Sequence, residues 1–238
     1  MSSLSTTASN QNKTIYLIRH GQSKGQTAKR HGIDRRRDQS LRDCGLSQKG
    51  KQQAAEIPNH FAARGISEES IELVISSPLT RALETAVLGF QHVSSSSSRS
   101  KQKTKKAPAP ILVHYGLREV DSSLPENTPR ASMEEVLQYI ALENTGNLTG
   151  EIDTASLQPK HWPKDDIDNY SNHDTKERRL RKIFQWIATE RTETTIAVVS
   201  HFGVIRAAVG AQYDLRPKNA VPIQCRLYPN GTLQVCVE

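Results

Sequence analysis

Two apolar, strand-sized runs that each end in a histidine constrain the fold of this chain more than any other feature. The first, Ile15–Ile18, leads into Arg19-His20-Gly21, and the second, Ile196–Val199, leads into Ser200-His201-Phe202-Gly203. In an open α/β sheet, ligands bind beyond the carboxyl ends of the strands. We therefore expect both histidines to reach one crevice from strands that are neighbours in space although distant in sequence.

Strand-like and helix-like patterns alternate along the rest of the chain. We expect strands over residues 14–19, 72–76, 111–115 and 195–200, a loop rich in Gly, Arg and Asp after the first of them, and a terminal hairpin over 223–228 and 232–237. Helices are expected over 47–64, 78–88, 132–142, 175–189 and 204–209, with Ser47 as an N-cap, Gly65 as a stop and Pro78 in a first turn. This alternation predicts an α/β, three-layer sandwich with a mostly parallel central sheet covered by helices on both faces.

The length of 238 residues suits one α/β domain with a sizeable core. We expect a disordered Ser/Thr-rich leader over residues 1–12 and a single domain over 13–238. Residues 120–172 are polar and irregular and are expected to form a small cap region before the terminal hairpin. The longest apolar runs have the length of strands, so no segment is expected to span a membrane.

The formal net charge of +7 is concentrated in one stretch, residues 93–110, which holds five cations and no acid: Arg99, Lys101, Lys103, Lys105 and Lys106. Its serines, lysines and Ala-Pro repeat cannot bury apolar surface, so we expect a low-complexity basic loop insertion. The rest of the chain is nearly balanced in charge, which argues against a nucleic-acid partner. A nuclear-import or polyanion-binding role for residues 99–106 stays open.

The three cysteines, Cys44, Cys225 and Cys236, form no CxxC pair and no disulfide framework, which fits a reducing, cytoplasmic location. Cys225 and Cys236 flank the expected hairpin turn. That turn allows either a two-residue or a three-residue loop, and the two differ by one in register. Whether these thiols face each other therefore stays open, and we treat both as reduced.

Polar groups of four loops at strand ends can converge. Arg19 and His20 follow the first strand, Arg81 lies in the first turn of a helix, and Glu119 and His201 follow later strands. Two guanidinium groups and a helix N-terminus together bind a phosphate dianion well. A neutral imidazole there can attack phosphorus, a carboxyl group can protonate the departing alkoxide, and a second histidine can stabilise the transition state.

Each of these residues taken singly has an ordinary structural interpretation. A lone histidine at a strand end is most often structural, a lone arginine is most often in a surface ion pair, and a lone glutamate carries little information. Their occurrence in compatible positions is what favours a site. The other histidines are scattered and are expected to be structural or exposed: His31, His60, His92, His114, His161 and His173.

Four motifs in order resemble those of the histidine phosphatase superfamily, in its phosphoglycerate-mutase-like branch, over roughly residues 14–210. They are Leu17–Ser23, Ser76–Ala86, Leu117–Glu119 and Val198–Gly203. The resemblance implies that His20 is transiently phosphorylated, that Arg19, Arg81 and His201 form the phosphate pocket, and that Glu119 donates a proton. It also implies that no metal or cofactor is needed. The expected substrate-binding residues are Arg19, Gln22, Ser23, Gln26, Arg81, His201 and Phe202.

Departures from the family pattern bear on the reaction. Gln26 stands where many relatives carry asparagine, and Gln22 replaces the commoner glutamate. The chain also lacks the Trp-Asn and the extended third motif that are usual in the mutases. These differences favour a metal-independent phosphatase that hydrolyses a small phosphate monoester. A phosphoglycerate-type mutase and a non-catalytic phospholigand-binding module remain alternatives, and the physiological substrate and oligomeric state are not predicted.

An Arg/Asp-rich loop, His31–Asp38, follows the first motif and holds three consecutive arginines. It can rim the pocket and bind a second acidic group of the substrate. It can equally be a solvated, charged loop, and the sequence favours neither interpretation.

Overall fold

The computed structural model describes residues 11–90, 107–119, 124–144, 151–155, 157, 173–210 and 216–236. Most of the predicted leader, residues 93–106 of the predicted basic segment and much of the predicted cap region lie outside the described residues. No helix in the described ranges is long and apolar enough to cross a membrane.

A seven-stranded sheet forms the centre of the molecule, in the order β4-β3-β2-β5-β1-β6-β7. β1 to β5 run parallel to one another, whereas β6 is antiparallel to β1 and β7 is antiparallel to β6 at one edge. The predicted α/β fold with a mostly parallel sheet and a terminal hairpin is therefore confirmed. The strands are β1 (Lys13–Arg19), β2 (Leu73–Ser76), β3 (Ile111–Val113), β4 (Ile152–Asp153), β5 (Thr195–Ser200), β6 (Pro222–Leu227) and β7 (Leu233–Val235).

The two apolar runs that precede the histidines are adjacent strands. β1 and β5 pair in parallel, with Ile15 opposite Ile196 and Arg19 opposite Ser200. His20 and His201 therefore leave the same edge of the sheet side by side, as the sequence predicted.

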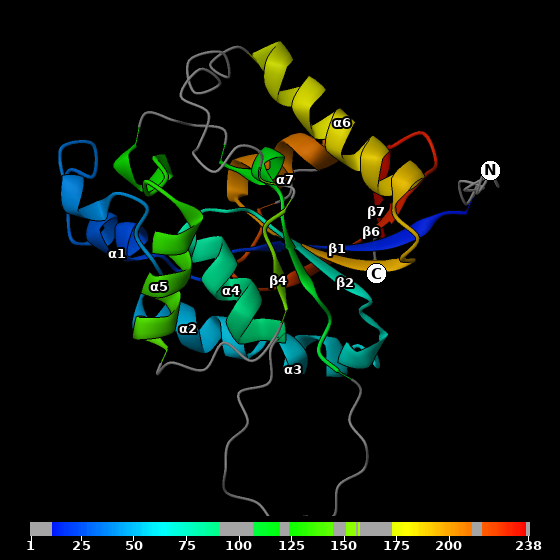
Figure 1. Ribbon diagram of the computed structural model, residues 1–238, viewed down its shortest axis with the longest axis horizontal. Coiled ribbons are helices and arrows are strands. Elements are labelled where there is room, and N and C mark those ends of the chain that lie inside the picture. The colour runs from blue at the N-terminus through cyan, green and yellow to red at the C-terminus, as the bar shows by residue number, and fades with distance from the viewer. Residues whose placement is uncertain are drawn as a thin grey trace, which may run out of the picture.

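Helices cover both faces of the sheet (Figure 1). On one face α6 (His173–Glu190) and α7 (Phe202–Val209) pack over the strand side chains that include Ile15 and Leu17. The other face carries the buried neighbours Tyr16 and Ile18. It is covered by α3 (Ile57–Ala62), α4 (Thr80–Phe90) and α5 (Met133–Glu143), with α2 (Gln48–Ala55) packed on α4. Successive β1 side chains thus fill two cores, because side chains alternate between the faces of a strand.

The single helix predicted over residues 47–64 is wrong: α2 and α3 are separate helices that meet at Glu56. Ser47 does cap α2, since its side chain accepts a hydrogen bond from the Gly50 amide. Pro58 lies at the start of α3 and has no N–H to donate one turn back, which a continuous helix would require. Gly65, at φ 69°, follows the end of α3.

Two elements lie where irregular structure was expected. The loop after β1 contains α1 (Lys24–Arg30), which begins with a capping box formed by Ser23 and Gln26. β4 adds a short parallel strand beside β3 in the stretch read as irregular. The chain also makes 3-10 turns at Gln39–Leu41, Glu68–Ser70, Tyr115–Leu117 and Pro125–Asn127.

The hairpin register settles the question of the two C-terminal cysteines. Cys225 pairs with Val235, so Cys225 and Cys236 are not directly opposite each other. Tyr228 and Thr232 close a three-residue loop in which Gly231 has a φ of 80°. Both thiols and that of Cys44 are free, and burial raises the pKa of Cys225 to about 12.

The basic segment is inserted at the amino-terminal edge of the parallel strands. α4 starts near the end of β2, runs back along the sheet and ends at Phe90, and β3 begins at Ile111. Residues Ala107–Ala109 lie near Ile71 and Phe90, just before β2 and β3 begin. The histidines lie at the other, carboxyl-terminal edge.

Candidate active site

Segments from four strand ends meet around one cavity of about 320 Å³. Its walls include most of the residues predicted from the sequence. The lining residues are Arg19, His20, Ser23, Gln26, Lys29, Arg35, Arg81, Glu119, Leu124, Glu126, Asn127, Phe202 and Gly203. Of the predicted site residues, Gln22 and His201 are not among them.

The hydrogen bonds of His20 select one tautomer of its ring. Nδ1 lies 2.7 Å from the Gly21 carbonyl oxygen, which can only accept, so Nδ1 carries the proton. Nε2 lies 3.3 Å from Nε of Arg81, which can only donate, so Nε2 presents its lone pair. The nitrogen at the cavity is therefore the unprotonated one, as a nucleophile requires.

The surroundings of His20 also keep its ring neutral. Burial and then the positive charges of Arg81 and Arg19 hold the pKa of His20 well below the ordinary 6.5, against a smaller opposing effect of the Gly21 hydrogen bond. His20 is 4% exposed, so solvent does little to stabilise an imidazolium. At neutral pH the ring is available as a base or nucleophile.

His201 lies beside His20, with ring centroids 5.2 Å apart. Its Nε2 is hydrogen bonded to Ser77 Oγ at 2.8 Å, and its buried Nδ1 has no hydrogen-bond partner among the described residues. Burial, followed by the charge of Arg81, holds the pKa of His201 well below 6.5. Two neutral histidines thus sit together next to the guanidinium groups.

Arg81 is fixed at both ends, by its helix and by the segment around Glu126. Asp43, which is fully buried, accepts hydrogen bonds from the backbone N–H and hydroxyl of Thr80, the first residue of α4, at 2.9 and 2.8 Å. The Arg81 guanidinium donates to the Glu126 carbonyl oxygen through Nη1 and to Asn127 Oδ1, at 2.7 Å, through Nη2. Its remaining donors are left for an anion in the cavity.

Arg19 also lines the cavity. Its Nη1 donates to the Pro217 carbonyl oxygen at 3.2 Å, and its guanidinium stacks 5.0 Å from the centre of the Phe202 ring. Its buried Nε has no hydrogen-bond partner among the described residues. Arg19 and Arg81 together supply the two cationic forks that a phosphate dianion requires.

Glu119 reaches the cavity from the segment after β3, behind the 3-10 turn Tyr115–Leu117. Its Oε2 lies 3.5 Å from the Gly203 amide, in the first turn of α7. The carboxyl group therefore shares the cavity with His20 and is positioned where it can exchange a proton with a bound ligand.

The side chains after His20 divide between the cavity and the scaffold. Ser23 and Gln26 line the cavity while they hydrogen bond each other's backbone in the capping box of α1. Gln22 instead turns toward α2, where its Oε1 accepts a hydrogen bond from Ser47 Oγ at 3.0 Å. The Gly21 amide donates to Thr85 Oγ1 at 2.9 Å, which ties this loop to α4.

Several residues at the site were not singled out from the sequence. Asn219 donates from Nδ2 to the His20 carbonyl oxygen at 2.7 Å, and Glu126 and Asn127 hold Arg81. No local pattern marks these residues, since they approach the site from distant parts of the chain. Lys29 was not predicted as a site residue either, whereas Arg35 belongs to the Arg/Asp-rich loop His31–Asp38, which the sequence did mark.

The cavity combines a neutral imidazole, two arginines and a carboxyl group, a set suited to transfer of a phosphoryl group. In the part of the chain that the structure describes, no three His, Cys, Asp or Glu side chains are grouped so that they could hold a metal ion.

Curated relatives carry phosphatase and mutase names. Phosphoglycerate mutase-like protein 1 of Arabidopsis thaliana is 27% identical over 245 residues, which cover 94% of this chain and 76% of that protein. A protein of Schizosaccharomyces pombe named a probable phosphatase is 39% identical over 80 residues, which cover 34% of this chain. That match spans only 33% of the yeast protein's length.

Solved structures share the fold at low sequence identity. A phosphoglycerate mutase from Bacillus anthracis has a TM-score of 0.52 and 19% identity, over 96% of this chain and 93% of that one. A phosphoserine phosphatase from Entamoeba histolytica has a TM-score of 0.51 and 15% identity, over 94% of this chain and 95% of that one. The sequence profile of the histidine phosphatase superfamily, branch 1, matches residues 15–236, and the chain therefore belongs to that superfamily.

Proposed function

We propose that this protein is a metal-independent phosphomonoesterase that acts on a small phosphorylated substrate through a phosphohistidine on His20. The observation that carries the proposal is the tautomer of His20. Its Nδ1 proton is held by the Gly21 carbonyl oxygen, so the lone pair of Nε2 faces the arginines that would bind the phosphate.

In the first step, Arg19 and Arg81 hold the phosphate oxygens and His20 Nε2 attacks phosphorus. The hydrogen bond that Arg81 Nε–H donates to His20 Nε2 in the free protein is redirected to a phosphate oxygen as the substrate enters, and the guanidinium keeps its proton. A P–N bond forms, the ester P–O bond breaks, and the leaving alkoxide takes the carboxyl proton of Glu119. His201 and the arginines stabilise the charge on the phosphoryl oxygens.

In the second step, water attacks the phosphohistidine. The Glu119 carboxylate accepts a proton from that water, the P–N bond breaks, and inorganic phosphate leaves with His20 restored to its neutral form. Each residue therefore ends the cycle in the state in which it began.

The test is a comparison of the parent protein with the His20→Ala variant on an aryl phosphate. We expect the variant to lose hydrolysis while its circular dichroism spectrum is unchanged, and the parent to form an acid-labile, alkali-stable phosphoprotein with labelled substrate. A folded variant that hydrolyses the substrate normally would contradict the mechanism. The Glu119→Gln variant should lose most activity toward alkyl phosphates and less toward 4-nitrophenyl phosphate, whose leaving group needs no proton.

A phosphoglycerate-type mutase is the second candidate, favoured by the name of the Arabidopsis thaliana relative. Incubation with 3-phosphoglycerate and a bisphosphorylated primer separates the two reactions, because a mutase returns the isomer and a phosphatase releases inorganic phosphate. A protein that binds phosphorylated ligands but never forms phosphohistidine would instead be a binding module. We also propose a cytoplasmic location, which three free cysteines support.

A further inference from the structure

The cavity carries more positive charge than one phosphate group needs. Four cationic side chains line it (Arg19, Lys29, Arg35 and Arg81) against the two carboxyl groups of Glu119 and Glu126. The proposed reaction, on which this inference rests, requires Glu119 to carry a proton at the start. A phosphate dianion bound there then leaves about one positive charge in the cavity without a counterion.

Arg35 is a fixed part of the wall. Its Nη1 forms an ion pair with Glu126 Oε1, and the two side chains are only 18% and 9% exposed. Glu126 is in turn held beside Arg81, because its carbonyl oxygen accepts from the Arg81 guanidinium. The pair therefore places a guanidinium with further N–H donors in the same cavity as the phosphate pocket.

Lys29 supplies the second cation. It is exposed, lies in the last turn of α1 and lines the cavity, and its side chain makes no hydrogen bond or ion pair with any residue that the structure describes. The neighbouring Arg30 is exposed as well but does not line the cavity. Only one of the two cations at this helix end is therefore placed to meet a bound ligand.

The space beyond the phosphate pocket suits a short carbon skeleton. The cavity volume of about 320 Å³ is at the lower end of the range for pockets that hold small molecules. Leu124 and Phe202 give its wall two apolar side chains, and Gln26 adds an amide. A small leaving group can thus extend from the phosphate pocket toward Lys29 and Arg35.

The geometry points to a second anion subsite, formed by Lys29 and Arg35, that selects phosphate monoesters whose leaving group carries another anionic group. That group is a carboxylate or a second phosphoryl group. The guanidinium of Arg35 can bind either through paired N–H donors, and the Lys29 ammonium adds a point charge at the rim.

Substrates that differ only at the second group test this subsite. Glycerol 3-phosphate has none, 3-phosphoglycerate carries a carboxylate on the same three-carbon skeleton, and glycerol 1,3-bisphosphate carries a second phosphoryl group. We expect kcat/KM for at least one of the two anionic substrates to exceed that for glycerol 3-phosphate about 10-fold at low salt. The substrate that the protein prefers shows whether the subsite binds a carboxylate or a phosphoryl group.

Two single variants test whether the preference comes from Lys29 itself or from the overall positive charge around the cavity. Lys29→Gln should reduce kcat/KM for the preferred anionic substrate about 5-fold relative to that for glycerol 3-phosphate. The matched Arg30→Gln variant removes the same charge one residue away and should leave the preference unaltered. The Arg35→Gln, Glu126→Gln double variant removes the ion pair without burying an unpaired charge and should also lose the preference.

Binding to the His20→Ala variant gives a readout that does not depend on turnover. Its dissociation constants for the same three compounds, from calorimetry, should show the same order. Equal values for all three compounds, or an equal effect of Lys29→Gln and Arg30→Gln, would overturn the subsite. A failure of the proposed reaction is distinguishable, because it would abolish phosphate release by the parent and leave these binding constants unequal.

Discussion

Asp43 is predicted to hold Arg81 in place from outside its helix, and the Asp43→Ala variant tests this. Asp43 Oδ1 accepts from the Thr80 amide at 2.9 Å, and Oδ2 accepts from the Thr80 hydroxyl at 2.8 Å and from the Arg130 amide at 3.3 Å. Its own amide donates to the Pro125 carbonyl oxygen. It thus joins the start of α4, which carries Arg81, to the segment whose groups orient the Arg81 guanidinium.

The size of the effect follows from the donors left behind. Alanine would strip the acceptor from the amide and hydroxyl of Thr80, which is fully buried, and each unsatisfied buried group costs about 1–3 kcal/mol. Arg130 is partly exposed, so water can replace the acceptor of its amide. We expect a loss of about 3–5 kcal/mol in the free energy of unfolding, which lowers Tm by roughly 2–4 °C per kcal/mol in a chain of this size.

Urea denaturation and steady-state kinetics on an aryl phosphate measure the two consequences. At temperatures where the variant is folded, kcat/KM should fall about 10-fold or more, because Arg81 loses the anchor of its helix turn. Asp34→Ala is the matched control, since Asp34 is an exposed acid whose ion pair with Arg37 is also exposed, and it should change stability by less than about 0.5 kcal/mol. A loss for Asp43→Ala below about 1 kcal/mol, with kinetics unchanged, would refute the reasoning.

Three further predictions concern the histidines and the loops that carry them. Because the folded-state pKa values of His20 and His201 are depressed, their contribution to stability is present above pH 6.5 and is lost as pH falls. Chemical denaturation should show a loss of about 1 kcal/mol in unfolding free energy per histidine between pH 7 and 5.5. The control variant His31→Asn, at an exposed site, should show the same dependence of unfolding free energy on pH as the parent. Ser77→Ala removes the hydroxyl that hydrogen bonds to His201 Nε2 and to the Leu79 amide. The variant should lower kcat about 10-fold and lose about 1 kcal/mol of unfolding free energy. A kcat equal to that of the parent would show that this hydrogen bond does not position His201. Gly50→Ala places a Cβ 2.0 Å from the Gln22 carbonyl oxygen, so the unfolding free energy should fall by about 1–3 kcal/mol. An unchanged midpoint of urea denaturation would contradict this close approach.

The sheet was predictable because its signals are local. Apolar runs mark β1, β2 and β5, and parallel strands present their carboxyl ends at one edge, so the convergence of the histidine loops followed without knowledge of the packing. The hairpin register was not predictable, because the turn residues allow two loop lengths and the three-residue loop is decided by pairing along β6 and β7.

The errors in the helices have identifiable causes. The break at Glu56 comes from Pro58, a helix breaker that the sequence displayed and that the 47–64 assignment overlooked. α1 was missed because its glycine and its basic residues suggested a loop, although Ser23 and Gln26 have the spacing of a capping box.

The residues that support Arg81 and His20 could not be predicted, because they depend on contacts between distant parts of the chain. Glu126 and Asn127 bind the Arg81 guanidinium across 45 and 46 residues, and Asn219 binds the His20 carbonyl oxygen across 199. Gln22 shows the opposite case, since it belongs to the motif yet hydrogen bonds to Ser47, which caps α2. Side-chain type indicates the chemistry, while packing decides which way the side chain faces.

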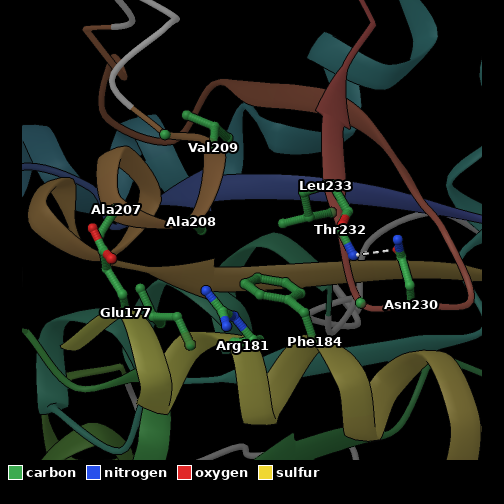
Figure 2. A pocket seen from close by; sticks show the side chains of 12 residues that line it. Glu177, Arg181, Phe184, Ala207, Ala208, Val209, Asn230, Thr232 and Leu233 are labelled. Carbon is green, nitrogen blue, oxygen red and sulfur yellow. Dashed lines mark hydrogen bonds between the residues drawn. The ribbon is translucent and has the colours of Figure 1, made fainter. Parts of the chain in front are cut away.

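The ends of α4 and β3 that flank the basic segment bear on where a tag can be attached to this protein. Phe90 and Ala107, where the described chain stops and resumes, lie at the edge of the sheet opposite the cavity that holds His20. A second pocket, of about 400 Å³, lies between α6, α7 and the hairpin loop (Figure 2), and none of its lining residues lines the cavity that holds His20. A tag inserted between Phe90 and Ala107 is therefore expected to join the chain away from the cavity that holds His20.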